Sequence, residues 1–235
     1  VTGLMINRPN ERYVGLFGST NSGATLRNLT LIDITVTGGR DVGGLVGNNF
    51  GNITDANVSG NVTGSGLDRV GGLVGRNSKG GRIQNATAAV SVTGDRRVGG
   101  LVGENRGTIQ NATAAVSVTG DRRVGGLVGV NGGGFNEDDG KIQNVRASGN
   151  VTGSDDNVGG LVGDNNGNIQ TATAFGNVTG GPERVGGLIG ENNRDGTVEN
   201  ARAFANVTGS GDSVGGLIGS NEGTVQTVRA SGSVN

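Results

Sequence analysis

Residues 83 to 103 read IQNATAAVSVTGDRRVGGLVG, and residues 109 to 129 read the same letters again. A catalytic centre cannot explain a verbatim copy, because an active site needs unlike groups that converge on one place. A phrase of Gly, Leu, an apolar residue and Gly recurs along the whole chain with spacings of 29, 28, 28, 26, 34, 27 and 29 residues. It begins at Gly15, Gly44, Gly72, Gly100, Gly126, Gly160, Gly187 and Gly216. Such a period predicts a solenoid, in which each unit packs only on its neighbours.

The composition excludes several classes of protein. Gly accounts for 51 of the 235 residues, and the chain contains no Cys, His or Trp. Without His and Cys there is no Ser-His-Asp triad, no Cys nucleophile and no His/Cys zinc site, so we expect no enzyme. A net charge of -1 provides no basic field for nucleic acid. No apolar run approaches the roughly 20 residues of a membrane-spanning helix, so we expect no membrane insertion.

The apolar residues alternate along the repeat with the period of a β-strand. Within residues 85–93, Ala86, Ala88, Val90 and Val92 fall on one face of such a strand. A slip of one residue would turn the whole set outward, so this face must be buried in every copy. We expect VGGLVG to form a second strand, and GTIQN to form a short third strand after a bend.

These strands predict an all-β fold, a parallel β-solenoid of about eight coils of 26 to 34 residues, with right-handed coiling favoured. We expect residues 1–235 to form one domain and, because both ends fall within the repeated phrase, to be a segment of a longer protein. The first repeat carries one extra residue in NLTLIDITVTG, which predicts a β-bulge.

The GLVG phrase at 44–47 and its counterparts resemble the GLUG motif of Gly, Leu, a small apolar residue and Gly. That motif is found in repeat regions of large bacterial surface and secreted proteins, including filamentous-haemagglutinin-like adhesins and some immunoglobulin-A-cleaving peptidases. The resemblance covers essentially all of the chain. It implies an extracellular or cell-surface location and an adhesin-like role.

An asparagine follows each later GLUG phrase by two residues and predicts a structural ladder. Stacked Asn side chains can hydrogen-bond along the axis of a solenoid and to the turn backbone. The ladder comprises Asn49, Asn77, Asn105, Asn131, Asn165, Asn192 and Asn221. Acids beside arginines in the turns, such as Asp41 beside Arg40 and Glu183 beside Arg184, are expected to be exposed pairs.

A row of threonines on the outward face suggests an alternative function. It comprises Thr37, Thr63, Thr93, Thr119, Thr152, Thr179 and Thr208. Regular Thr rows on flat solenoid faces resemble the surface of ice-binding proteins. Larger side chains occupy other outward positions of the same strands and roughen that face, namely Arg146, Arg202, Arg229, Phe175 and Phe204.

An insertion at 132–141 breaks the rhythm of the repeats and is expected to project as a loop. Loops that project from rigid scaffolds often carry function. Its candidate contacts are Phe135, Glu137, Asp138 and Asp139. The carboxylates could bind Ca²⁺, but their spacing matches neither an EF-hand nor a Gly-rich nonapeptide repeat, so no cofactor is expected. Phe175 and Phe204 are the next candidates for contact with a ligand or partner.

The sequence therefore favours a structural or adhesive stalk of a surface or secreted protein, with ice binding as the alternative. Expected partners are a host or neighbouring-cell surface, through glycan or protein, or other copies that associate through the solenoid ends. Nothing in the residues identifies the ligand.

The pattern of inward residues makes a direct prediction about stability. Val90→Asp buries a charge in a narrow apolar core and should lower the free energy of unfolding by more than about 4 kcal/mol. Thr87→Asp, on the opposite face of the same strand, should change it little. Thermal unfolding followed by circular dichroism measures both. Equal effects of the two substitutions would contradict the assignment of faces.

Overall fold

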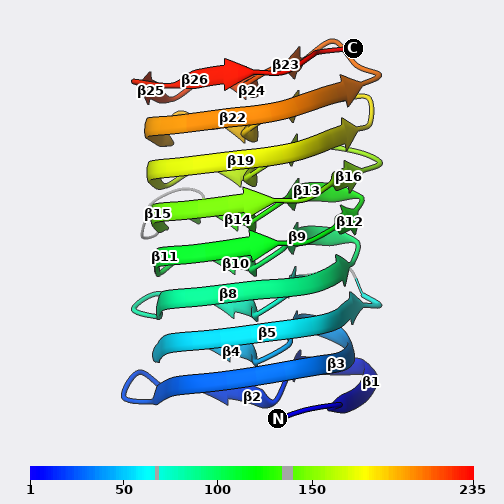
Figure 1. The fold of residues 1–235 in the computed structure, drawn as a ribbon, viewed down its shortest axis with the longest axis vertical. Helices are drawn as coiled ribbons and strands as arrows, with labels where there is room; N and C mark the ends of the chain where they lie inside the picture. Colours follow the sequence, from blue (N-terminus) through cyan, green and yellow to red (C-terminus); the bar gives the residue numbers. More distant parts are fainter. Residues whose placement is uncertain (67–68, 134–139) are drawn as a thin grey trace.

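The computed structural model describes residues 1–66, 69–133 and 140–235. These residues form an elongated stack of coils, with the N-terminus at one end and the C-terminus at the other (Figure 1). They contain strands and turns but no helix, and therefore no helix that could cross a bilayer. Successive coils pair in parallel, for example β8 (Arg82–Thr93) with β11 (Thr108–Ala115). The prediction of a parallel β-solenoid of about eight coils is confirmed.

Long strands form one face of the solenoid and lie side by side in Figure 1. The earlier ones are β1 (Met5–Val14), β3 (Thr25–Gly43), β5 (Asn52–Gly64) and β8. The later ones are β11 followed by β12 (Val118–Gly120), β15 (Lys141–Ser148) followed by β16 (Val151–Gly153), β19 (Asn168–Gly180), β22 (Thr197–Gly209), and β25 (Thr224–Gln226) followed by β26 (Arg229–Ser231).

Two further sets of strands complete each coil. A short strand follows the long one: β6 (Val70–Gly71), β9 (Arg96–Gly99), β13 (Arg122–Gly125), β17 (Val158–Gly159), β20 (Val185–Gly186) and β23 (Val214–Gly215). After a bend comes a sheet of eight strands: β2 (Phe17–Thr20), β4 (Val46–Asn49), β7 (Val74–Asn77), β10 (Val102–Asn105), β14 (Val128–Asn131), β18 (Val162–Asn165), β21 (Ile189–Asn192) and β24 (Ile218–Asn221).

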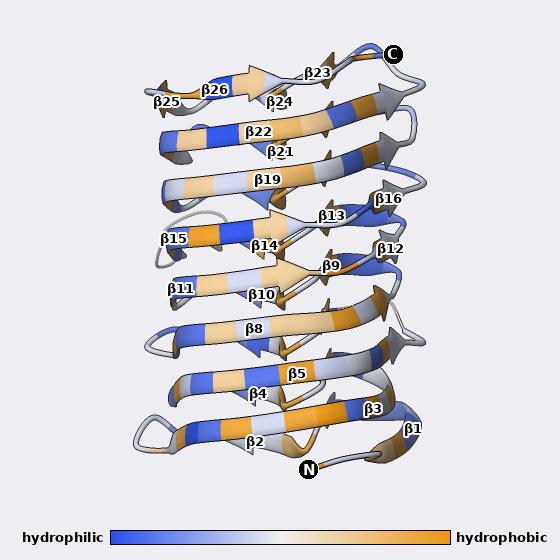
Figure 2. Ribbon diagram, viewed as in Figure 1, coloured by the Kyte–Doolittle hydropathy of each residue, from blue (hydrophilic) through white to orange (hydrophobic). Residues whose placement is uncertain are grey.

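A column of small and branched apolar side chains fills the interior. Leu101 after the bend, Ile109 at the start of the next long strand, and Val124 are fully buried, as are their counterparts in most coils. Figure 2 shows how hydrophobic and hydrophilic residues alternate along the long strands. The inward positions predicted for residues 85–93 are confirmed, since Ala86, Ala88, Val90 and Val92 are all buried.

Two details of the predicted strands are wrong. VGGLVG is not one strand, because the chain bends at Gly100 and Leu101 between β9 and β10. GTIQN at 107–111 is not a separate strand, because β11 runs on without a break through Asn111, as β8 does through Asn85. Asn85 has a φ of 51°, and this left-handed residue turns the strand while its ladder of hydrogen bonds continues.

The bulge predicted in the first repeat is confirmed. The pairing of β3 with β5 shifts register between Leu31 and Ile34, so that Ile32 and Asp33 lie opposite a single residue. Asp33 has a φ of 54°, which fits an extra residue accommodated by a local left-handed turn.

The verbatim repeats do not form identical strands. The first copy forms the unbroken β8, whereas the second is divided into β11 and β12 around Val116. The neighbouring coils differ at this point, because Gly149 lies beside Val116 with a φ of 137°. Val116 donates its N–H to the Ser148 carbonyl there. The local strand extent therefore depends on the adjacent coil as well as on the sequence of the strand itself.

Close stacking at the bend explains why the phrase contains glycine. A Cβ at Gly100 would overlap the carbonyl oxygen of Gly126 in the next coil, whereas a Cβ at Gly23 would meet nothing within 4 Å. Gly100→Ala should therefore lower the free energy of unfolding by about 1–3 kcal/mol through overpacking, and Gly23→Ala should have little effect. Urea unfolding of the two variants tests this difference, and equal stability would show that the bend has room for a side chain.

Candidate functional site

The seven predicted ladder asparagines lie in one row on the eight-stranded sheet, and all but the last, the exposed Asn221, are buried. Each donates its side-chain N–H to the Oδ1 of the next asparagine, and the six N···O distances are 2.7 to 2.9 Å. The row is extended at the N-terminal end by Thr20, whose hydroxyl donates to Asn49 Oδ1 at 2.7 Å. Both hydrogens of a side-chain amide can be donated in this row. Asn105 Nδ2, for example, donates to Asn131 Oδ1 and also to the Gly107 carbonyl at 3.3 Å.

Two exposed amide rows run beside the long strands. Gln84, Gln110, Gln143 and Gln170 are linked by Nε2 to Oε1 distances of 3.1 to 3.3 Å. The left-handed residues of the long strands form a second row, in which Asn144 donates to Asn111 at 2.7 Å. The buried row and these exposed rows all run along the solenoid axis and tie each coil to the next.

The outward threonines also stand in register. Their strand pairings join Thr37, Thr63, Thr93, Thr119, Thr152, Thr179 and Thr208 in order. All but Thr37 are exposed. The row two positions earlier is mixed, since Thr35, Asn61 and Ser91 follow one another there.

Arginine and phenylalanine side chains gather on the C-terminal half of the long-strand face. Arg146, Arg202 and Arg229 share one outward row, with Thr173 between the first two. Phe175 and Phe204 are in register in the adjacent outward row. We call these five residues the aromatic–arginine strip.

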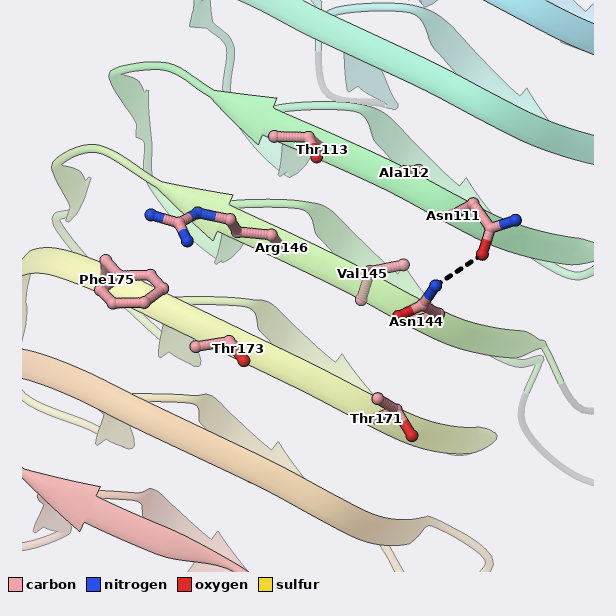
Figure 3. A pocket seen from close by; sticks show the side chains of 9 residues that line it. All are labelled: Asn111, Ala112, Thr113, Asn144, Val145, Arg146, Thr171, Thr173 and Phe175. Carbon is pink, nitrogen blue, oxygen red and sulfur yellow. Dashed lines mark hydrogen bonds between the residues drawn. The ribbon is translucent and has the colours of Figure 1, made fainter.

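Phe175 touches two other side chains of the strip. The rings of Phe175 and Phe204 are stacked with centroids 5.1 Å apart and planes 17° apart. The Arg146 guanidinium carbon lies 4.1 Å from the Phe175 ring centroid, a cation–π contact. Figure 3 shows Arg146 and Phe175 reaching across neighbouring strands, beside an open depression of about 390 Å³.

A second depression borders the other end of the ring stack. Its volume is about 400 Å³, and Asn177, Phe204, Asn206, Ser231 and Gly232 contribute to its lining. Phe204 is 44% exposed. In the next coil the position of the ring is taken by Ser231, so one end of the stack faces a small side chain.

The insertion candidates Phe135, Glu137, Asp138 and Asp139 lie outside the described residues. Elsewhere, in the ranges that the structure describes, no three carboxylates are grouped closely enough to hold a metal ion.

A buried ion cluster that the repeat pattern does not predict lies on the outer side of the eight-stranded sheet. Glu104 is only 2% exposed, and its carboxylate is surrounded by guanidinium groups. The distances are 2.6 Å to Arg69 Nε, 2.7 Å to Arg106 Nε, 3.5 Å to Arg97 Nε and 3.6 Å to Arg76 Nε. Burial alone would raise the pKa of Glu104, but Arg69, Arg97 and Arg106 hold it below its usual value.

The expectation that Asp41 forms an exposed pair with Arg40 is wrong. Asp41 is 1% exposed, and its Oδ1 accepts a hydrogen bond from Arg69 of the next coil at 2.9 Å. The other expected pair is found, since Arg184 lies 2.9 Å from Glu183 at the surface. The missed partners lie 28 and 35 residues apart in sequence, so adjacency in the chain could not reveal them.

Two acids meet in the same row further along the sheet. Asp164 and Glu191 are paired positions of β18 and β21. Burial raises the pKa of Asp164, and Glu191 raises it further, against the opposing effects of Arg123 and the amides of Asn193 and Asn166. Arg123 Nε lies 3.0 Å from Asp164 Oδ2.

The repeats are matched by a family model described as the GLUG motif. It covers residues 38–63, 66–93, 94–119, 120–152 and 181–208, which together are more than half of the chain. This chain belongs to the GLUG-motif family. In each described coil the GLUG phrase forms the bend and the first residues of the strand that belongs to the eight-stranded sheet. Gly100 and Leu101, for example, form a bend, and Val102 begins β10, which ends at Asn105.

Two relatives are similar to part of the chain. Halomucin from Haloquadratum walsbyi is 47% identical over 60 residues, which is 26% of this chain and 1% of halomucin. A protein of Evansella cellulosilytica, provisionally named a Gly-rich membrane protein, is 44% identical over 61 residues, which is 25% of this chain and 7% of that protein. The chain thus spans a small part of each relative. No solved structure matches it.

The ion cluster predicts a loss of stability that depends on pH. Glu104→Gln leaves the arginines without their carboxylate and should lower the free energy of unfolding at pH 7 by about 3 kcal/mol. The pKa of Glu104 is lower in the folded protein than in the unfolded chain, where it is about 4.3. The carboxylate therefore makes its full contribution to the free energy of unfolding above about pH 4.3, and this contribution is lost as the pH falls through the pKa of the folded state.

Urea unfolding at pH 7 and at pH 3 measures this change, with the exposed Glu222→Gln as the matched control. The difference in free energy of unfolding between wild type and Glu104→Gln should be smaller at pH 3 than at pH 7. An equal difference at both pH values would show that the carboxylate contributes through packing and not through charge.

Proposed function

We propose that this solenoid is a non-enzymatic structural module of a cell-surface or secreted protein, which extends from the cell and takes part in attachment. The observation that carries the proposal is the unbroken row of asparagines from Asn49 to Asn221, in which the same hydrogen bond joins each coil to the next. A repeated contact of this kind allows the rod to change length by whole coils while its cross-section is kept.

The relatives support a location outside the cell. One is named halomucin, and the other is provisionally named a membrane protein. The resemblance to bacterial adhesins agrees with this location. Attachment would be to a glycan or protein of a host or neighbouring cell, or to other copies through the coil ends.

Insertion of a coil tests the structural part of the proposal. A second copy of residues 94–119 placed after Thr119 should lengthen the rod by about 4.8 Å, the spacing between paired strands, and unfolding should stay cooperative. Small-angle X-ray scattering and thermal unfolding measure the two effects. Insertion of only residues 94–106 is the control, because half a coil breaks the register. An expanded particle with the full insert would contradict the proposal.

The location has its own test. An antibody against the solenoid should label intact cells that carry the gene, without permeabilisation. Labelling only after permeabilisation would contradict an extracellular role and would leave the rod properties unaffected.

Ice binding remains the second candidate, because the outward threonines stand in register on neighbouring coils. We expect no thermal hysteresis, since arginine and phenylalanine side chains interrupt the same face in the later coils. Hysteresis that disappears when Thr93, Thr119 and Thr152 are replaced by Tyr would favour ice binding over the structural role.

A further inference from the structure

The three arginines of the aromatic–arginine strip carry charge that the protein itself does not neutralise. Within the described residues, none of them lies within 4.0 Å of a carboxylate oxygen, and Arg146 contacts only a ring. The ion pairs of other arginines lie in the turns and over the eight-stranded sheet, for example Arg122 with Asp155 and Arg184 with Glu191. An exposed row of unpaired guanidinium groups suits a ligand with regularly spaced negative charges.

The arginine row is confined to one part of the face. In the earlier coils the same row contains Thr30, Asn57, Thr87 and Thr113. Guanidinium groups appear there in β15, β22 and β26, and the adjacent row has its phenylalanines in β19 and β22. Charge and aromatic ring therefore occur together in β22, and the strands on either side of it supply one or the other.

The surroundings of Phe204 add the groups that a sugar ring requires. One end of the ring stack borders the open depression that Asn177, Asn206, Ser231 and Gly232 help to form. An aromatic face can pack against the C–H groups of a pyranose, and side-chain amides can bond its hydroxyls. Asn206 accepts hydrogen bonds from Ser233 and donates to Asn177 at 3.3 Å, so one hydrogen of its amide group is free to donate.

We propose that the aromatic–arginine strip binds a linear polysaccharide that carries carboxylate groups, laid along the solenoid axis. Successive coils present Arg202 and Arg229 to carboxylates of the polymer, since a guanidinium fork matches a carboxylate with two parallel hydrogen bonds. Phe204, in the adjacent row of the same strand as Arg202, stacks on a sugar ring beside them, with Asn177 and Asn206 at its hydroxyls. A nucleic acid fits the strip less well, because three arginines on a chain of net charge -1 provide too few phosphate contacts.

Polysaccharide binding goes beyond the structural role proposed above and rests on that proposal only for the extracellular location. Its failure would leave the rod intact, because the coil-insertion test involves no ligand. If the antibody showed an internal location, the strip would still bind the polymer in vitro.

Binding to polygalacturonate tests the proposal on the whole 235-residue chain. Affinity electrophoresis should show strong retardation of the wild type by polygalacturonate and none by neutral dextran. Arg202→Gln with Arg229→Gln, and separately Phe204→Ser, should each weaken binding by at least about ten-fold. Serine is chosen because Ser231 occupies the same row in the next coil.

The matched control is Arg82→Gln, which removes an exposed arginine from the same face at β8. It should leave binding unchanged, and unfolding curves should show that every variant remains folded. An equal loss with Arg82→Gln would overturn the proposal in favour of non-specific charge. Absence of wild-type binding would also overturn it, as would equal or tighter binding of dextran sulfate or duplex DNA.

Discussion

The paired residues of successive coils lie over one another in this solenoid, and this in-register stacking constrains their side chains. A group can be repeated along the axis only if it tolerates a copy of itself at the spacing of paired strands. Asparagine meets the condition, because its amide both donates and accepts, and the row from Asn49 to Asn221 is bonded throughout. Glycine meets it at the bend for a different reason, since Gly100 and Gly126 leave no space for a side chain between them.

Like charges repel each other across the spacing of two coils, and in the verbatim repeats acids at other positions offset this repulsion. Duplication places Arg96 over Arg122. Acids at non-equivalent positions neutralise the excess positive charge near these coils: Asp155 pairs with Arg122, and Glu104 lies close to Arg97. The row that contains Glu104 accordingly varies from coil to coil, with Arg76 before it and Val130 after it. Identical coils can follow one another only where such compensation is available.

In-register stacking also explains which features could be predicted from the sequence. The repeat period, the buried face of the long strands and the asparagine ladder each depend on a pattern within one repeat, and this pattern occurs many times in the chain. The burial of Asp41 against Arg69 depends on a contact between coils, and so does the division of the second verbatim copy at Val116. The bend within VGGLVG was missed because a strand of small residues and a tight turn have the same composition. Phe175 and Phe204 were singled out as isolated exposed rings, whereas their contact with each other and with Arg146 depends on register.

Recognition on such a scaffold can arise only at positions that the stacking leaves free. Inward rows are fixed by the narrow core, the bend is fixed by glycine, and the asparagine row is fully bonded. The outward rows of the long strands are exposed, and their residue type changes between coils without a change in the strand pairing, as from Thr113 to Arg146 and Thr173. A surface with several rows at a constant spacing suits a polymer with a constant repeat. The aromatic–arginine strip lies on these free rows, where a ligand contact could be acquired coil by coil without disturbing the rod.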